Sequence, residues 1–154
     1  GTAGDFTYYV SQTVNGCEGP RAGIPVTVNP TPGAPAVTTP VNLCQNGPTQ
    51  PLSATASGSN TLRWYTVSTG GTASTTAPPP PTTSTGTFNY YVSQVNAANC
   101  ESPRAVISAV VNALPAAPTN VTNAEVCQLS GNITLTASGQ NLKWYTTATG
   151  GTAS

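Results

Sequence analysis

Charge is scarce in this sequence. Only 5% of its 154 residues are charged, and four acidic residues balance four basic ones, whereas a typical globular domain carries about 25% charged residues. Nucleic-acid binding needs a basic face, and four scattered cations cannot form one. We therefore exclude nucleic acid as a partner.

Histidine and methionine are absent, and Asp5 is the only aspartate. Without histidine, the chain lacks the usual base that activates a serine or cysteine nucleophile. Calcium needs about six to eight oxygen ligands, which the scattered carboxylates do not supply. No apolar run approaches the ~18 residues of a membrane span. The sequence predicts no enzyme activity, no metal or other cofactor, and no membrane span in this segment.

Threonine, valine, glycine and proline are abundant instead, with 15 glycines and 15 prolines. Low charge combined with proline and glycine is also typical of disordered chains, but such chains are poor in aromatic and β-branched residues. Here aromatic and β-branched residues recur in ordered patterns between turn residues. This pattern indicates an all-β fold.

The strongest feature is an internal repeat, because four motifs return in the same order. Residues 6–12 return as 88–94, 17–22 as 100–105, 62–66 as 142–146, and 70–74 as 150–154. Strand-like residues 26–29 and 110–112 each precede a proline-rich linker. We therefore predict that residues 1–29 are the C-terminal part of a preceding repeat, 30–112 a complete repeat, and 113–154 the N-terminal part of a following one.

From this division we expect the sequence to be part of a longer repetitive protein. The alternative is that the two partial repeats complete each other between neighbouring molecules. Alternating apolar and polar residues predict strands over 52–56 and 61–66, with counterparts over 133–137 and 142–146. About seven short strands per repeat, with a tryptophan in the third, predict tandem immunoglobulin-like β-sandwiches. A fibronectin III-like sandwich is the alternative, which periodicity does not separate.

Aromatic residues on the third predicted strand alternate between its two faces. Trp64 shares a face with Leu62, which predicts a core position. Tyr65 points the other way, and Tyr91 follows the same parity on its own strand. We predict that Tyr65 and Tyr91 offer exposed aromatic contacts, with cross-strand packing as the alternative.

Cysteines occur twice in the complete repeat, as Cys44 and Cys100, with counterparts Cys127 and Cys17. An even number per repeat in a β-rich chain indicates an oxidising, extracellular compartment. We predict a Cys44–Cys100 disulfide at one end of the sandwich, with free thiols as the main alternative. A zinc site is not expected without histidine or a C-x-x-C motif.

Two charged pairs keep the same spacing in both copies, three residues apart around a proline: Glu18 with Arg21, and Glu101 with Arg104. We predict a local salt bridge in each copy that fixes the loop after the cysteine. An exposed pair of this kind contributes less than ~1 kcal/mol. The alternative is a pair that binds a ligand.

The order of these motifs resembles the Ig-like repeat of very large Bacteroidota surface proteins. In this chain the motif covers residues 62–65, 70–71, 78–81, 86–94 and 100–104. The resemblance implies export by a type IX secretion system and a place in surface adhesins, including those of gliding bacteria. It implies no catalytic residues.

We therefore expect a structural stalk or filament segment of a cell-surface adhesin, outside the bacterial cell, that supports a distal binding region. Its expected partners are neighbouring repeats of the same chain, with surface glycans or other surface and secretion proteins as further candidates. The alternative is a carbohydrate-binding or spacer module of a secreted multidomain enzyme. That alternative needs exposed aromatic residues such as Tyr65 and Tyr91.

Overall fold

The structure is a computed structural model that describes residues 1–128 and 131–153. It falls into two compact units, Gly1–Ala113 and Leu114–Ser154. Strands are the only regular secondary structure of the described residues, which confirms the all-β prediction. The described residues contain no helix that could span a membrane. The strands are β1 (Gly4–Val10), β2 (Thr13–Val14), β3 (Cys17–Glu18), β4 (Ala22–Val28), β5 (Ala36–Val37), β6 (Val41–Cys44), β7 (Ala54–Thr55), β8 (Thr61–Tyr65), β9 (Gly86–Val95) and β10 (Ala105–Asn112).

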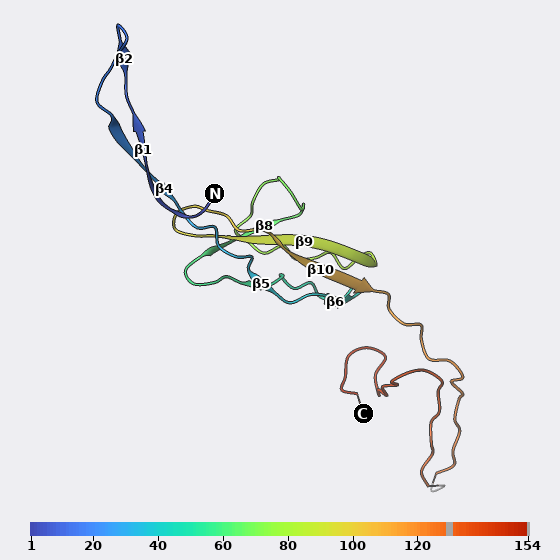
Figure 1. The fold of residues 1–154 in the computed structure, drawn as a ribbon. Coiled ribbons are helices and arrows are strands. Elements are labelled where there is room, and N and C mark those ends of the chain that lie inside the picture. Colours follow the sequence, from blue (N-terminus) through green and yellow to red (C-terminus); the bar gives the residue numbers. More distant parts are fainter. Residues whose placement is uncertain (129–130, 154) are drawn as a thin grey trace. The chain divides into compact units, whose positions relative to one another are not determined.

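A four-stranded sheet in the order β6-β10-β9-β8 forms the centre of the first unit (Figure 1). β9 and β10 are its antiparallel middle strands, paired from Ala105↔Val92 to Val111↔Gly86. β8 adds antiparallel to β9. β6 adds parallel to β10, and its last residue, Cys44, pairs with Asn112. The first long strand of the repeat is therefore hydrogen-bonded to the last, and both run in the same direction.

The core lies on one face of this sheet. Successive side chains of a strand point to opposite faces, so the alternation of the sequence selects which residues are buried. Leu52, Trp64, Val92 and Ile107 form the buried cluster. Trp64 is only 4% exposed, which confirms its predicted core position. The short β5–β7 pair supplies a second layer, because Val37 and Ala54 pack against this cluster.

The repeat found in the sequence returns as a repeated hairpin. β1 pairs with β4 antiparallel, with Tyr8 opposite Ile24. β9 pairs with β10 in the same register, with Tyr90 opposite Ile107. A slip of one residue would turn the apolar side chains to the opposite face. The shared register shows that both copies place equivalent residues on equivalent faces.

Burial distinguishes the two hairpins. Ile107 on β10 is fully buried, whereas its counterpart Ile24 on β4 is 49% exposed. The difference follows from their neighbours: β9–β10 lies between β6 and β8, while β1–β4 forms a sheet of two strands. A two-stranded hairpin with no covering layer is only marginally stable in water.

The second unit has much less regular structure. A bridge between Thr119 and Ser138 is present, but the described part of the unit contains no strand. The strands predicted over 133–137 and 142–146 are therefore not observed. In the first unit, β6 and β8 pair with β10 and β9, and residues 114–128 and 131–153 contain no counterparts of those two central strands.

Candidate functional site

A polar cluster is built around Glu101, in the loop that joins β9 to β10. Its carboxylate accepts hydrogen bonds of 2.5 Å from the Tyr65 hydroxyl, 2.5 Å from the Ser93 hydroxyl and 3.1 Å from Arg63 Nη1. Arg63 also donates to the side-chain oxygen of Asn99 at 3.3 Å. The cluster joins two strands to the loop that follows them.

Side chains alternate between the two faces of β8 and β9, and this alternation brings the polar groups of the cluster to the same face. Arg63 and Tyr65 are two residues apart on β8 and share the face opposite to Trp64. Ser93 pairs with Arg63 across the β8–β9 ladder. A bridge between Val95 and Glu101 then brings the loop back to the end of β9. The cluster therefore lies on the outer face of the sheet.

The environment of Glu101 favours its ionised form. The hydrogen bond from Ser93 is the largest cause that lowers the pKa of this carboxyl, followed by the one from Tyr65, and Arg63 acts in the same direction. Partial burial opposes these effects without reversing them. Hydrogen bonds to a carboxylate stabilise its charged form, so Glu101 accepts all three bonds as an anion at neutral pH.

Arg104 contacts the other side of Tyr65. Its guanidinium lies 3.3 Å from the centroid of the Tyr65 ring, within the range of a cation–π interaction. It also donates to the carbonyl oxygens of Val67 at 2.7 Å and Gly70 at 2.8 Å. Arg104 therefore holds the turn after β8 and covers the tyrosine.

The predicted Glu101–Arg104 pair is wrong, because Glu101 forms its ion pair with Arg63 instead. The planar fork of Arg104 is used for the tyrosine ring and the turn carbonyls. In the first copy, Glu18 and Arg21 lie 3.8 Å apart at an exposed position. Ser11 donates to Glu18, as its counterpart Ser93 donates to Glu101.

Tyr65 is not an exposed contact residue. It is only 6% exposed, because its hydroxyl bonds to Glu101 and its ring lies under Arg104. The prediction of an exposed aromatic at this position is therefore wrong. Tyr91 is half-buried and lies opposite Tyr65 and Val106 in the two ladders, the arrangement expected for cross-strand packing.

The predicted Cys44–Cys100 disulfide is also wrong. Cys44 pairs with Asn112 at the C-terminal end of β10, whereas Cys100 lies in the loop before the first residue of that strand. The eight residues of β10 span about 25 Å at about 3.3 Å each. A disulfide needs Cα atoms within ~7 Å. Both thiols are free, and they lie at opposite ends of the domain.

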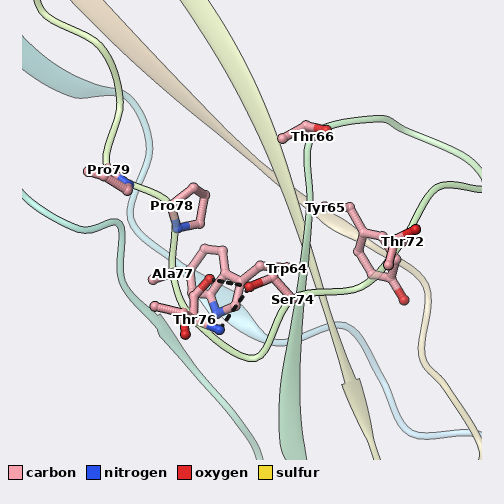
Figure 2. A pocket seen from close by; sticks show the side chains of 9 residues that line it. All are labelled: Trp64, Tyr65, Thr66, Thr72, Ser74, Thr76, Ala77, Pro78 and Pro79. Atoms are coloured by element: carbon pink, nitrogen blue, oxygen red, sulfur yellow. Dashed lines mark hydrogen bonds between the residues drawn. The ribbon is translucent and has the colours of Figure 1, made fainter.

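A shallow hollow of about 300 Å³ lies beside β8 (Figure 2). Trp64 lies on the side of Ala77, while Tyr65 lies beside Thr72. Backbone bonds of 2.8 and 2.9 Å between Trp64 and Ser74 fix the wall of the hollow. Its lining offers hydroxyl, aromatic and proline groups and no carboxylate, and the described residues include no cluster of three metal-ligating side chains.

A second polar anchor lies at the end of β9. The side chain of Gln94 is buried, donates to the carbonyl of Gly33 at 2.7 Å and accepts from the Ser57 backbone at 2.7 Å. Asn96 donates to the carbonyl of Pro30 at 2.9 Å. Sequence reasoning missed this anchor. Its signal was the return of Ser-Gln at the end of an otherwise apolar strand, at 11–12 and 93–94.

Comparison with known proteins assigns the complete repeat to a family. Residues 32–112, more than half of the chain, match the model of the family described as "Ig-like domain CHU_C associated". No curated protein matches the chain. The family match confirms the predicted Ig-like fold. The chain therefore belongs to the family of Ig-like domains associated with CHU_C.

Proposed function

We propose that this chain is a load-bearing stalk segment of a large, repetitive cell-surface adhesin. The observation that carries the proposal is the position of the two ends of residues 30–112. Gln94 and Asn96, at the end of β9, hold Gly33 and Pro30 where the chain enters the domain. The chain leaves after Asn112, at the opposite end of the same sheet. Domains with ends placed in this way join head to tail into a rod.

Strand direction supports the same role. β6 lies near the start of the domain, and β10 ends it, parallel to β6 and paired with it from Val41 to Cys44. Tension on the two ends of the domain pulls these parallel strands in opposite directions. Their hydrogen bonds are then loaded in shear, all at once. Such an arrangement resists force better than a ladder that opens one bond at a time.

The joints between domains also suit a stalk. The linker over 30–35 contains three prolines, which fix backbone angles and make a segment semi-rigid. Asn96 and Gln94 anchor its first residues to the domain. A linker that is both stiff and anchored limits bending between neighbouring domains.

The proposed location is the bacterial surface, after export by a type IX secretion system. The family association with CHU_C supports this location and is consistent with a surface protein of Bacteroidota. In this proposal the segment is not an enzyme, and its partners are the neighbouring repeats of its own chain. A distal region of the adhesin binds the target surface, in adhesion or gliding.

Solution scattering tests the stalk. Chains are prepared in which residues 30–112 are present once, twice or four times between residues 1–29 and 113–154. We expect the maximum dimension to grow by a constant ~30–40 Å per added copy, from the length of the strands and a short linker. A dimension that grows only as the cube root of mass would indicate compact packing of the copies and would contradict the proposal.

A further inference from the structure

The two cysteines of the complete domain lie at its two joints. Cys44 ends β6 beside Asn112, where the chain leaves the domain. Cys100 lies at the other end, and its Sγ is 4.0 Å from the carbonyl oxygen of Asn29, the residue before the linker. One thiol therefore lies where the chain leaves the domain, and the other lies where the chain enters it.

The two hairpins have the same register, so the complete domain shows which residue of the preceding repeat would pair with Asn29. β4 and β10 have equivalent registers, so Asn29 is the counterpart of Asn112. In the complete domain, Asn112 pairs with Cys44, and its carbonyl accepts a 2.8 Å hydrogen bond from the backbone N–H of Gln45. The carbonyl side of this asparagine is therefore the side on which the cysteine strand lies. The thiol of Cys100 lies on the corresponding side of Asn29.

We infer that Cys100 forms a disulfide with the cysteine at the Cys44 position of the preceding repeat, so that successive repeats are joined covalently across each linker. This inference rests on the proposed tandem stalk. By the same rule, Cys44 pairs with the cysteine at the Cys100 position of the next repeat. Cys17 and Cys127 show that both positions hold cysteine in the other copies within the chain.

The geometry brings the two cysteine positions close together. Paired strands lie about 4.8 Å apart, so a cysteine at the Cys44 position lies one strand spacing from Asn29, whose carbonyl oxygen already contacts Cys100 Sγ. Cys44 is exposed and Cys100 half-buried, so an oxidant reaches both. The two thiols together lose two protons and two electrons as the S–S bond forms. A small-molecule disulfide takes them up and is reduced to two thiols.

A chain with a duplicated domain tests the bond directly. Residues 30–112 are inserted a second time after Asn112, so that one complete joint lies between a first and a second copy. In the joint variant, all cysteines become serine except Cys44 of the first copy and Cys100 of the second. Two matched variants each keep a different pair of cysteines. The first keeps Cys44 and Cys100 of the first copy, and the second keeps Cys100 of the first copy and Cys44 of the second.

The three variants are equilibrated with glutathione and its disulfide, treated with iodoacetamide, and weighed by mass spectrometry. We expect the joint variant to lose both alkylation sites and to regain them after reduction, while both matched variants are labelled at two thiols. The chain with all its cysteines retained is expected to leave two thiols unlabelled, which gives a readout that does not depend on the serine substitutions. Circular dichroism of the reduced proteins checks that each chain is folded.

Full labelling of the folded joint variant would overturn the inference, and so would oxidation of the pair within one copy. The stalk itself is tested separately, by scattering from the reduced multi-copy chains. A rod formed by the reduced chains, together with full labelling of the joint variant, would leave the proposed function intact and reject only the covalent joint.

Discussion

Arg63 on β8 donates a 3.1 Å hydrogen bond to Glu101, in the loop after β9, so one ion pair joins the edge strand to the end of the central hairpin. The same carboxylate accepts from Tyr65 and Ser93. Removing this anion therefore affects three side chains together, and its effect depends on pH.

Glu101→Gln is expected to lower stability at pH 7 by about 1–2 kcal/mol, because hydrogen bonds to a charged group are stronger than those to a neutral one. The pKa of Glu101 is lowered from its ordinary value of 4.5 in the folded protein. Its stabilising effect is therefore present above that value and disappears as the pH falls through the lower folded pKa. Denaturation by guanidinium at pH 7 and pH 3 measures both quantities.

Glu18→Gln is the matched control, since Glu18 occupies the equivalent position in the exposed first hairpin. We expect it to change stability by less than ~0.5 kcal/mol at either pH. If the difference between Glu101→Gln and the native chain were the same at pH 3 and pH 7, the carboxylate charge would not be the source of the effect.

Arg104→Ala is expected to loosen the turn after β8, because it removes the cation over Tyr65 and the hydrogen bonds to the Val67 and Gly70 carbonyls. We expect a loss of about 1–2 kcal/mol and faster hydrogen exchange of the amides over 66–72. Arg104→Lys should recover only part of the loss, since an ammonium cannot reproduce the planar fork. Unchanged exchange in Arg104→Ala would show that the turn is held by other contacts.

Ile107→Ala is expected to cost about 2–4 kcal/mol, because it leaves a cavity in the core of the complete domain. Ile24 occupies the same register position on β4 but is 49% exposed. Ile24→Ala should therefore cost less than ~1 kcal/mol in the same chain. Thermal unfolding followed by tryptophan fluorescence compares them, and equal shifts in Tm would contradict the difference in packing.

The four cysteines of the chain as it stands are expected to react fully with iodoacetamide without prior reduction. Cys44 and Cys100 are held apart by the length of β10, so neither reaches the other in a folded monomer. Intact mass after labelling at low protein concentration gives the number of modified thiols. A mass that is lower than that of the fully modified chain by two labels would indicate a disulfide within the chain, which this fold does not allow.

The strand pattern and the core of the complete domain could be predicted from the sequence because both depend on local alternation. Trp64 and Ile107 lie at the alternating apolar positions of their strands, which point into the core. The two copies of each motif have the same spacing, and this spacing predicts the same register for both hairpins. The second unit was harder to predict, since a strand needs a partner as well as a pattern. Residues 133–137 alternate clearly but form no strand.

The cysteine pairing and the exposure of Tyr65 depend on contacts between segments far apart in the sequence. Cys44 would lie near Cys100 if β6 ran antiparallel to β10, and the sequence contains no signal for that choice. Tyr65 is buried because Glu101 and Arg104 approach it from the loop after β9. Strand alternation gives the face of a side chain but not what covers that face.

Cysteines at opposite ends of the domain also set how far the stalk can stretch. Once its joints are oxidised, the shortest covalent path runs from Cys100 of one repeat through the linker to the Cys44 position of the next repeat, and across the disulfide to the repeat after that. This path contains about 27 residues, as between Cys100 and Cys127, or ~90 Å when extended, for every two repeats. Two repeats of about 83 residues each would reach ~600 Å without the disulfides. A pulled stalk would thus become taut along its linkers, and the segment from Cys44 to Cys100 would carry no load.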